Sequence, residues 1–438
     1  MTVLAIVLIL LSMSLFSISM LTLWWMLHAW RDPETLEATG FLNESGRPEL
    51  SFSLLVPARH EQDVLEETLE QLLAIDHPSF EVLPIVGHDD PATAAVAARV
   101  AERHGDRVRI VVDQNWPKNK PKALNTALPL CRGEIVGVFD AEDEVDARLL
   151  RSVDRTFQST GADVVQGGVQ LVNFRSNWYA LRNCLEYFFW FRSRLHLQSR
   201  YQFLPLGGNT VFIRTDLLRS VDGWDSACLA EDCELGVRLS SMGARFAVAY
   251  DPYLVTREET PDSLLALLKQ RTRWNQGFLQ VLHKGHWKQL PSRRQRLLAR
   301  YTLSQPFLQA FAGIAIPFAI ICTLVLRAPL GIALLSFMPA VPTIAMFVFE
   351  AVGMREFCRV YFVRPRVRDY LRLLIGAPFY QVLLAVAALR AVVRESRGER
   401  NWEKTAHHGA HRDASGRSGT PDFTARPRSV PELERKAA

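Results

Sequence analysis

The chain has 438 residues, a formal net charge of +5 and 48% hydrophobic residues, which leaves room for one large domain plus membrane spans. Much of the arginine excess flanks two strongly apolar regions, residues 3–27 and 305–393, as expected of segments that face anionic lipid. No basic stripe interleaved with aromatic residues is present, so we expect no nucleic-acid partner. The six cysteines follow neither a disulfide framework nor zinc-site spacing, which indicates a reducing compartment.

The first apolar region predicts a membrane span. Residues 1–27 carry no charged side chain, and the stretch is too long for the core of a signal peptide. Because roughly 20 apolar residues suffice to cross a bilayer, we predict an N-terminal transmembrane helix within residues 1–30. The first charge, Arg31, follows this helix and favours an outside N-terminus with a cytoplasmic large domain.

The next part of the chain, residues 50–290, reads as alternating strands and helices. Apolar runs predict strands at 54–56, 81–86, 108–112 and 134–139, and each is followed by a helical stretch. Such alternation predicts an α/β fold, with a mostly parallel sheet covered by helices on both faces. A further strand is expected over 164–172.

Acidic residues follow two of these strands. Asp89 and Asp90 come after the second strand, whereas Asp140 and Glu142 come after the fourth. The carboxyl ends of parallel strands open into one crevice, and acids clustered there favour a divalent cation that holds a nucleotide diphosphate. Lys120, on a Pro/Lys loop, offers a cation for the same diphosphate. The alternatives are an ordinary acidic loop and a solvated lysine loop.

The second half of the α/β region carries an aromatic, arginine-rich helical segment over 178–200, which suits either a membrane interface or a core helix capping the sheet. Gly207 and Gly208 then permit close approach of backbone to a ligand. Glu231 and Asp232 open a helix whose dipole favours an ionised carboxylate, so Asp232 is a candidate base. A plain helix cap is the alternative.

An amphipathic helix from Pro261 carries the run Gln270 to Trp274. Two guanidinium groups in this run, those of Arg271 and Arg273, suit a leaving diphosphate. The indole of Trp274 offers a face on which a sugar ring can stack.

Three apolar segments follow, at 303–326, 330–350 and 371–393. Six arginines in the loop 351–372, and others after residue 393, place both flanks of the last segment inside. We therefore predict three full crossings, with 371–393 either re-entrant near Gly376 and Pro378 or lying along the interface. The tail beyond about residue 411 is expected to be disordered.

Four separated pieces resemble the D, D-x-D, (T)ED and Q-x-x-R-W set of membrane-embedded family-2 glycosyltransferases with the GT-A fold: Asp89-Asp90, Asp140-Ala141-Glu142, Glu231-Asp232 and Gln270–Trp274. That branch includes cellulose, hyaluronan, chitin and poly-N-acetylglucosamine synthases, and the resemblance runs from about residue 50 to 282. Residues 401–407 of the tail also resemble the family's cytosolic gating element.

The resemblance implies roles for individual residues. It places Asp89 or Asp90 at the nucleobase, Lys120 at the diphosphate, and Mg²⁺ or Mn²⁺ on Asp140 and Glu142. Because Glu142 replaces a common aspartate, Asp143 is the alternative ligand. Asp232, beside Glu231, is the implied general base, and Arg271 and Arg273 steady the leaving group. The implied acceptor residues are Gly207, Gly208, Asn209, Gln270 and Trp274, and the implied gating residues are Trp402, Lys404, Thr405 and His407.

Together these features predict a cytoplasmic GT-A domain at 50–290, inserted between the N-terminal helix and a membrane region at 303–393, with a cytoplasmic tail over 394–438. The implied activity is that of an inverting, metal-dependent hexosyltransferase of the bacterial plasma membrane. It would use a nucleotide-sugar, on family grounds a UDP-sugar, and form a β-linkage to a growing polysaccharide or a lipid-linked acceptor. Single transfer to a lipid, or a non-catalytic scaffold of a polysaccharide-export complex with export partners, are the alternatives.

Overall fold

A seven-stranded, mostly parallel sheet forms the centre of the molecule. The computed structural model describes residues 2–30, 47–325, 327 and 329–403. The strand order is β3-β2-β1-β4-β7-β5-β8, and only β7 runs antiparallel to its two neighbours. The strands are β1 Phe52–Ala58, β2 Phe80–Gly87, β3 Val111–Asp113, β4 Ile135–Val138, β5 Val164–Gly167, β7 Val211–Arg214 and β8 Phe246–Ala249. This arrangement confirms the predicted α/β fold of the GT-A type.

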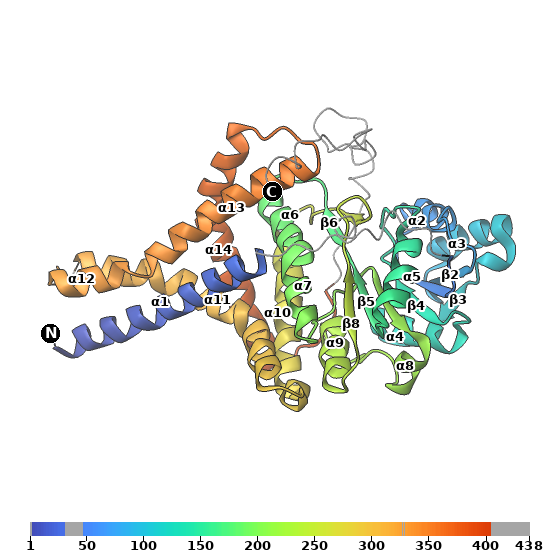
Figure 1. Ribbon diagram of the computed structural model, residues 1–438, viewed down its shortest axis with the longest axis horizontal. Coiled ribbons are helices and arrows are strands. Elements are labelled where there is room, and N and C mark those ends of the chain that lie inside the picture. Colours follow the sequence, from blue (N-terminus) through green and yellow to red (C-terminus); the bar gives the residue numbers. More distant parts are fainter. Residues whose placement is uncertain (1, 31–46, 326, 328, 404–438) are drawn as a thin grey trace.

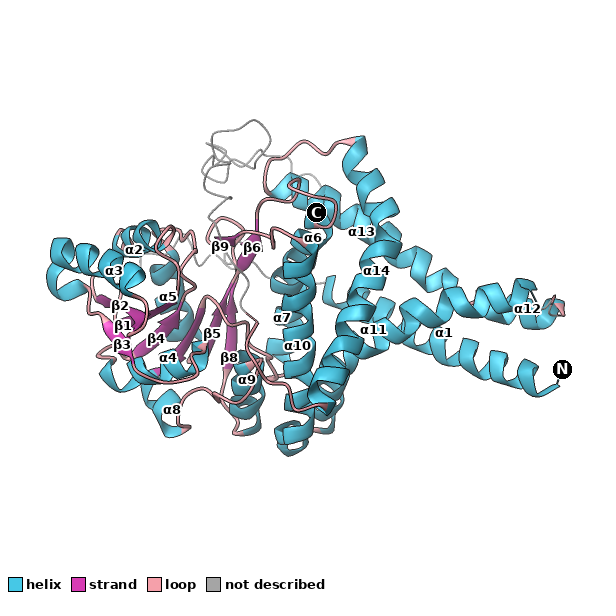
Figure 2. Cartoon of the chain, turned by 180° about the vertical axis from the view of Figure 1, so that it is seen from behind, coloured by secondary structure: helices cyan, strands magenta, loops and turns pink. Residues whose placement is uncertain are grey.

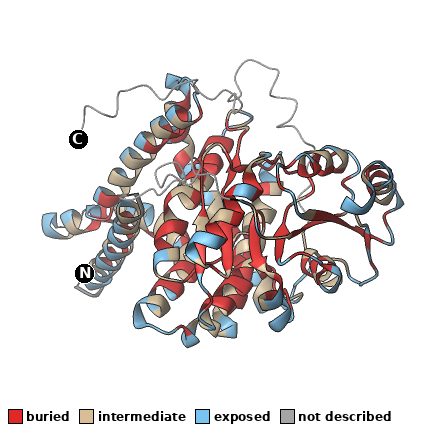
Figure 3. Cartoon of the chain, turned by 45° about the vertical axis from the view of Figure 1, so that its right-hand side comes forward, coloured by how far each residue is buried: buried red, intermediate tan, exposed pale blue. Residues whose placement is uncertain are grey.

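Helices cover both faces of the sheet, and each face has its own hydrophobic cluster. One cluster joins β1 to α2 Leu65–Leu73, α3 Pro91–His104 and α5 Leu149–Thr160. The other cluster includes residues of α4 Lys120–Ala127, α7 Leu195–Arg200, α8 Thr215–Ser220 and α9 Glu231–Ser241. Figure 3 shows the buried residues concentrated in these layers. The layers leave the carboxyl ends of β1, β2 and β4 at one edge, where the acidic residues follow.

One sequence prediction about the sheet is wrong. The single strand expected over 164–172 is two strands, because the chain leaves the sheet after Gly167, and β6 Val169–Leu171 pairs with β9 Thr256–Glu258 in a separate two-stranded sheet. A Cβ on Gly168 would lie 2.8 Å from a side-chain carbon of Val255, so the crossing backbone has no room for a side chain there.

In the part of the chain that the structure describes, four apolar helical segments are long enough to cross a membrane: 5–28, 293–325, 330–360 and 367–396. They belong to α1 Thr2–Trp30, α11 Arg293–Val325, α12 Leu330–Phe337 with α13 Ala340–Val360, and α14 Val367–Ser396. Large apolar side chains on them face outward, including Leu10 at 61% and Ile321 at 58% exposure. In Figures 1 and 2, α1 and α12 project away from the sheet, whereas α14 runs across that direction beside α10 Leu264–Lys284.

The segment 178–200 lies between the sheet and these apolar helices. It forms α6 Ala180–Phe189, a π-helical turn over Trp190–Arg194, and then α7. Buried side chains of α6 pack on Met354 and Phe357 of α13. It is therefore a buried helix that joins the α/β domain to the apolar helices.

The re-entrant form of the prediction for 371–393 is wrong, because α14 is one continuous helix with Pro378 inside it. A single proline removes one backbone hydrogen bond and bends a helix without reversing it. Both ends of α14 contact the α/β domain: Arg175 pairs with Asp369 at 2.7 Å, and Gln276 donates to Glu395 at 3.0 Å. These contacts favour the interfacial form, which stays a prediction.

Candidate functional site

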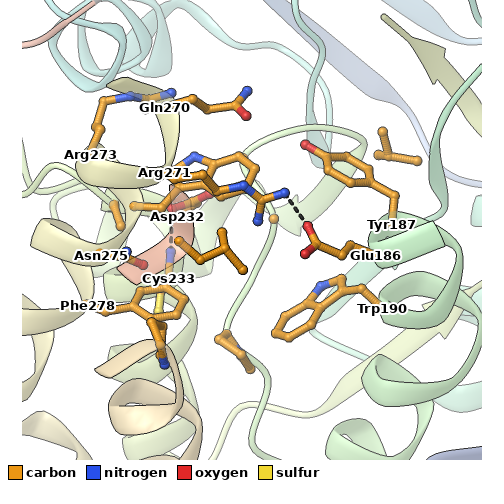
Figure 4. Close-up of a pocket in the computed structure, with 18 of the residues that line it drawn as sticks. Glu186, Tyr187, Trp190, Asp232, Cys233, Gln270, Arg271, Arg273, Asn275 and Phe278 are labelled. Atoms are coloured by element: carbon orange, nitrogen blue, oxygen red, sulfur yellow. Dashed lines mark hydrogen bonds and ion pairs between the residues drawn. The ribbon is translucent and has the colours of Figure 1, made fainter. Parts of the chain in front are cut away.

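A cavity of about 1190 Å³ lies between the sheet edge and the apolar helices. Its lining includes acidic side chains that follow β4 and begin α9, as well as side chains of α1, α6, α10, α11, α13 and α14. Figure 4 shows one part of the lining, where Glu186 and Tyr187 of α6 lie opposite Arg271 of α10, with Asp232 of α9 beside Arg271. The cavity therefore joins the sequence-predicted site to the membrane region.

Lys120 and Asp140 meet inside this cavity. Asn119 caps α4 by accepting from the amide of Lys122 at 3.0 Å, so the helix begins at Lys120, three residues earlier than the sequence predicts. The ammonium group of Lys120 forms an ion pair with Asp140 and donates to the carbonyl of Gly208 at 2.7 Å. Burial lowers the pKa of Lys120, but the carboxylates of Asp140 and Glu231 outweigh it and raise the pKa above its ordinary value. Lys120 is thus a permanent cation within the acidic part of the cavity.

Glu142 and Asp143, the two alternatives for the second metal ligand beside Asp140, have different surroundings in the structure. Glu142 lines the cavity, whereas Asp143 is fully buried beneath it. Asp143 accepts hydrogen bonds from the amide of Asp140 and from the side chain of Asn209, both at 2.8 Å. Its oxygens therefore shape the loop, and Glu142 is the better placed second carboxylate.

The donor set at this loop fits a divalent cation. Burial, together with the charges of Asp140 and Glu61, raises the pKa of Glu142 well above its usual range. A divalent cation between Asp140 and Glu142 would relieve this repulsion, and a diphosphate would complete its oxygen ligands. Within the described ranges no group of three or more His, Cys, Asp or Glu side chains could hold a metal unaided.

The candidate base, Asp232, lies in the first turn of α9, where the charge of Lys120 acts on it. One carboxylate oxygen of Asp232 accepts from the amide of Cys233 at 2.7 Å. A Cβ on Gly208 would lie 2.9 Å from the other oxygen, so the glycine is required where the 207–208 loop packs against Asp232. This contact brings a predicted acceptor loop to the predicted base.

Burial raises the pKa of both acids in that turn. The pKa of Glu231 rises to about 8 through burial and the neighbouring Asp232, against the opposing charges of Lys120 and Arg273. Burial also raises the pKa of Asp232, although the amide of Cys233 and the same cations lower it. The helix N-terminus alone therefore does not set the ionisation of Asp232, contrary to the sequence-based expectation.

The two arginines of α10 have different surroundings. Arg271 forms an ion pair with Glu186, donates to Asn183 at 2.6 Å, and lies 4.8 Å from the ring centre of Trp274 (Figure 4). Arg273 instead lies over the ring of Trp402 at 4.4 Å. Its charge lowers the pKa of Glu231 and of Asp232, the two acids that begin α9. Arg273 is thus the arginine nearer the reacting groups, and Arg271 links α10 to α6.

Neither Asp89 nor Asp90, the residues predicted at the nucleobase, lines the cavity. Asp90 is 2% exposed and caps α3 by accepting from the amide of Thr93 at 3.3 Å. Asp89 pairs with Arg59 at 2.9 Å, and Arg59 lines the cavity. Contact of either acid with a nucleobase stays a prediction.

Among the described residues that line the cavity, the acids Glu61, Asp113, Glu186, Glu258 and Glu350 were missed by the sequence reasoning, and the first two come at the ends of strands. Asp113, which ends β3, lines the cavity and accepts from the amide of Asn115 at 2.9 Å. Glu61, in the loop after β1, also lines the cavity. Both follow parallel strands, so the rule that identified Asp140 could have found them.

The remaining predicted residues are distributed as follows. Gly207, Gly208, Asn209, Gln270 and Trp274 all line the cavity, and so does Trp402 of the proposed gate. Glu403 pairs with Arg390 at 2.6 Å and with Arg394 at 3.4 Å, which ties the beginning of the tail to the end of α14. Lys404, Thr405 and His407 lie outside the described residues.

Solved and curated proteins resemble this chain in fold and sequence. A beta-monoglucosyldiacylglycerol synthase of Trichormus variabilis is 28% identical over 236 residues, which cover 52% of this chain and 49% of that protein. A poly-beta-1,6-N-acetyl-D-glucosamine synthase of Staphylococcus epidermidis is 23% identical over 278 residues, covering 62% and 64% respectively. The match thus spans about half the length of the first relative.

A mannosyltransferase of Pyrobaculum calidifontis, solved in complex with GDP-Man and Mn²⁺, superposes with a TM-score of 0.55 at 19% identity. The superposition covers 90% of this chain and 99% of that protein, which shows a shared fold. The family model described as "Glycosyltransferase like family 2" matches residues 48–277, more than half of the chain. The chain therefore belongs to glycosyltransferase family 2.

Proposed function

We propose that this chain is an inverting hexosyltransferase that moves a hexose from a nucleotide-sugar to a hydroxyl of a polysaccharide or lipid-linked acceptor, with a β-linkage as the product. One observation carries the proposal: a single cavity brings Lys120, Asp140 and Glu142 together with Asp232. The first three suit a diphosphate, and the fourth suits a hydroxyl. A scaffold without catalytic function would have no use for this set of buried charges, whose burial is costly.

On the donor side, Lys120 and Arg273 would bind the diphosphate as cations, with Asp89 or Asp90 toward the nucleobase. Asp140 and Glu142 would hold Mg²⁺ or Mn²⁺, which neutralises charge on the departing nucleoside diphosphate when bound. Arg271, held by Glu186, would act by positioning α10 and the indole of Trp274. We infer a UDP-sugar from the family resemblance.

On the acceptor side, Asp232 would accept the proton of the attacking hydroxyl. The hydroxyl oxygen then forms a bond to the anomeric carbon as the bond from that carbon to the diphosphate breaks, which inverts the configuration. The raised pKa of Asp232 increases its strength as a base, because a catalytic pKa nearer to the working pH transfers protons more effectively. Glu231, whose pKa is raised to about 8, adds a protonated neighbour that limits repulsion.

The four apolar segments support a location at a membrane. Because the bacterial relatives share the matched region, we place the enzyme in a bacterial plasma membrane with its α/β domain toward the cytoplasmic nucleotide-sugar. Trp402 lines the same cavity as Asp232, which supports a position of the beginning of the tail on that side as well.

The decisive test is nucleoside diphosphate release by the full chain in membranes of the expressing cells, which supply acceptor hydroxyls, with Mn²⁺ and a panel of radiolabelled nucleotide-sugars. We expect release from one sugar class, abolished by Asp140→Ala and retained by Asp106→Asn, an exposed acid remote from the cavity lining. Absence of release from every donor would overturn the proposed function.

A further inference from the structure

The cavity continues past the catalytic acids into the bundle of apolar helices. We call this continuation the membrane arm. It is lined by Ser19 and Thr22 of α1, Gln305, Gln309 and Gly313 of α11, Met346, Phe347 and Glu350 of α13, and Gln381 of α14. An enclosed space between spans, continuous with a transferase site, is where an acceptor would lie if it stays in the membrane.

The inner end of the membrane arm carries a charged pair. Glu350, on a candidate span, pairs with Arg182 of α6 at 2.7 Å. Its second carboxylate oxygen is buried and lacks a hydrogen-bond partner among the residues described, as does the side-chain oxygen of Gln381. Ionisable residues within spans are costly and mark binding sites or pathways. Two acceptor oxygens in one cavity therefore point to a ligand that donates hydrogen bonds, such as a hydroxylated headgroup.

Polar contacts connect this pair to the catalytic side. The guanidinium of Arg182 lies 5.8 Å from the ring centre of Tyr380, and the hydroxyl of Tyr380 is 3.0 Å from Glu186. Glu186 in turn pairs with Arg271, which covers one face of Trp274. All five side chains line the cavity, so a headgroup at Glu350 would meet a continuous polar wall leading toward Asp232.

The lining becomes apolar farther along the membrane arm. Ile18 of α1, Ile316 and Pro317 of α11, and Met346 and Phe347 of α13 offer hydrocarbon surface, with neither an indole platform nor a charge among them. A saccharide chain needs hydrogen bonds or stacking at successive rings, whereas this lining suits acyl or alkyl chains. The change in polarity along one cavity matches an amphiphile.

We propose that the membrane arm is the acceptor site and that it takes a membrane amphiphile with a hydroxyl-bearing headgroup. Glu350, held by Arg182, binds the headgroup, and the apolar lining accommodates the chains. This inference rests on the proposed function and specifies its acceptor class. Of the two forms of that function, it selects single transfer to a lipid over growth of a polymer.

The test uses the full chain in membranes of the expressing cells, which supply their own lipids, and the labelled nucleotide-sugar that the release assay selects. We expect label in the chloroform–methanol phase. Label in ethanol-insoluble polymer, or only in free sugar, would overturn the lipid assignment. In either case nucleoside diphosphate release would leave the proposed function standing, whereas its absence from every donor would remove both.

Glu350→Gln is compared with Glu356→Gln, a matched control. Glu356 lies on the same helix, pairs with Arg192 and does not line the cavity. Because hydrogen bonds to a charged group are lost, Glu350→Gln should lower lipid-phase label by about tenfold or more. Equilibrium binding of the nucleoside diphosphate should persist in Glu350→Gln, and Glu356→Gln should retain transfer. Equal losses in the two variants would show a structural role and overturn the assignment.

A second pair of variants does not depend on removing a charge. A Cβ on Gly313 would lie 3.5 Å from the side-chain oxygen of Gln381, an ordinary contact, so Gly313→Leu should be accommodated and partly fill the membrane arm. Gly331 of α12 has nothing within 4 Å of such a Cβ, and Gly331→Leu is the control. We expect lipid-phase label to fall severalfold in Gly313→Leu alone, with equilibrium binding of the nucleoside diphosphate unchanged. Unchanged lipid-phase label in Gly313→Leu would exclude the membrane arm as the acceptor site.

Discussion

The two sides of the cavity are built in different ways. The donor side takes its charges from the α/β domain, where Lys120 and Asp140 lie at the start of a helix and the end of a strand. The acceptor side is assembled from helices far apart in the sequence, so that Glu350 of α13 meets Arg182 of α6 and Arg271 of α10 meets Glu186. Under the proposed function, donor chemistry is therefore set by local structure within the sheet edge, and acceptor chemistry by packing between helices.

The largest expected effect is a loss of transfer on substitution of Asp232, where the donor and acceptor sides meet. Asp232→Asn should leave nucleotide binding nearly intact, since the diphosphate residues are unchanged, and should reduce transfer by about 10²–10⁴-fold through loss of the general base. Product formation and equilibrium nucleotide binding measure the two effects separately. Transfer within a few-fold of the original would refute the role of Asp232, and a parallel loss of binding would mean that donor and acceptor sides are not separable.

A second comparison tests the donor side alone. Glu142→Gln should weaken nucleoside diphosphate binding in the presence of Mn²⁺ and have little effect without it, because Glu142 faces the cavity. Asp143→Asn should instead lower stability by about 1–3 kcal/mol, because Asp143 accepts from the amide of Asp140 and from Asn209. Calorimetric titration with and without metal, together with thermal unfolding, distinguishes the two. The reverse pattern would make Asp143 the ligand, and metal-independent transfer would exclude the metal from the reaction.

The residues that could be predicted from sequence are those governed by local rules. Asp140 follows a buried strand, and Glu231 begins α9 as predicted, because strand ends and helix starts are visible in the order of apolar and polar residues. Asp113 obeys the same rule but stands alone after the predicted strand 108–112, without a second acid to draw attention to it.

Contacts between distant helices could not be predicted in the same way. Arg271 was assigned to the diphosphate because of its charge, yet the structure places it against Glu186, 85 positions away in sequence. No periodicity within α10 identifies that partner, since the contact arises from packing of α6, α10 and α14. Gly376 and Pro378 likewise made a re-entrant segment one of the two predicted forms, but the surrounding α14 remains helical.

A smaller effect is expected in the pH dependence of stability, and it comes from Glu231, the neighbour of Asp232. The pKa of Glu231 is raised from an ordinary value of 4.5 to about 8, so between these values the folded chain holds a proton that the unfolded chain releases. The free energy of unfolding should therefore fall as pH rises through this range. Glu231→Gln should flatten that slope, as measured by thermal unfolding midpoints in detergent, whereas Asp106→Asn should leave it unchanged. An unaltered slope in Glu231→Gln would mean that Glu231 is ionised throughout.

The smallest expected effect concerns Trp402, whose ring packs against Arg273 in the cavity between the donor and acceptor sides. The ring of Trp402 lies 4.4 Å from the guanidinium of Arg273, and a cation–π contact of this kind is worth about 0.5–2 kcal/mol. Trp402→Ala should therefore raise the KM for the nucleotide-sugar by roughly two- to thirtyfold, because Arg273 loses the surface that orients it toward the diphosphate. Trp287→Ala, on a tryptophan that does not line the cavity, is the control. If Trp402→Ala instead impaired acceptor use with an unchanged donor KM, the tail would belong to the acceptor side, and its role as a gate over bound nucleotide would have to be abandoned.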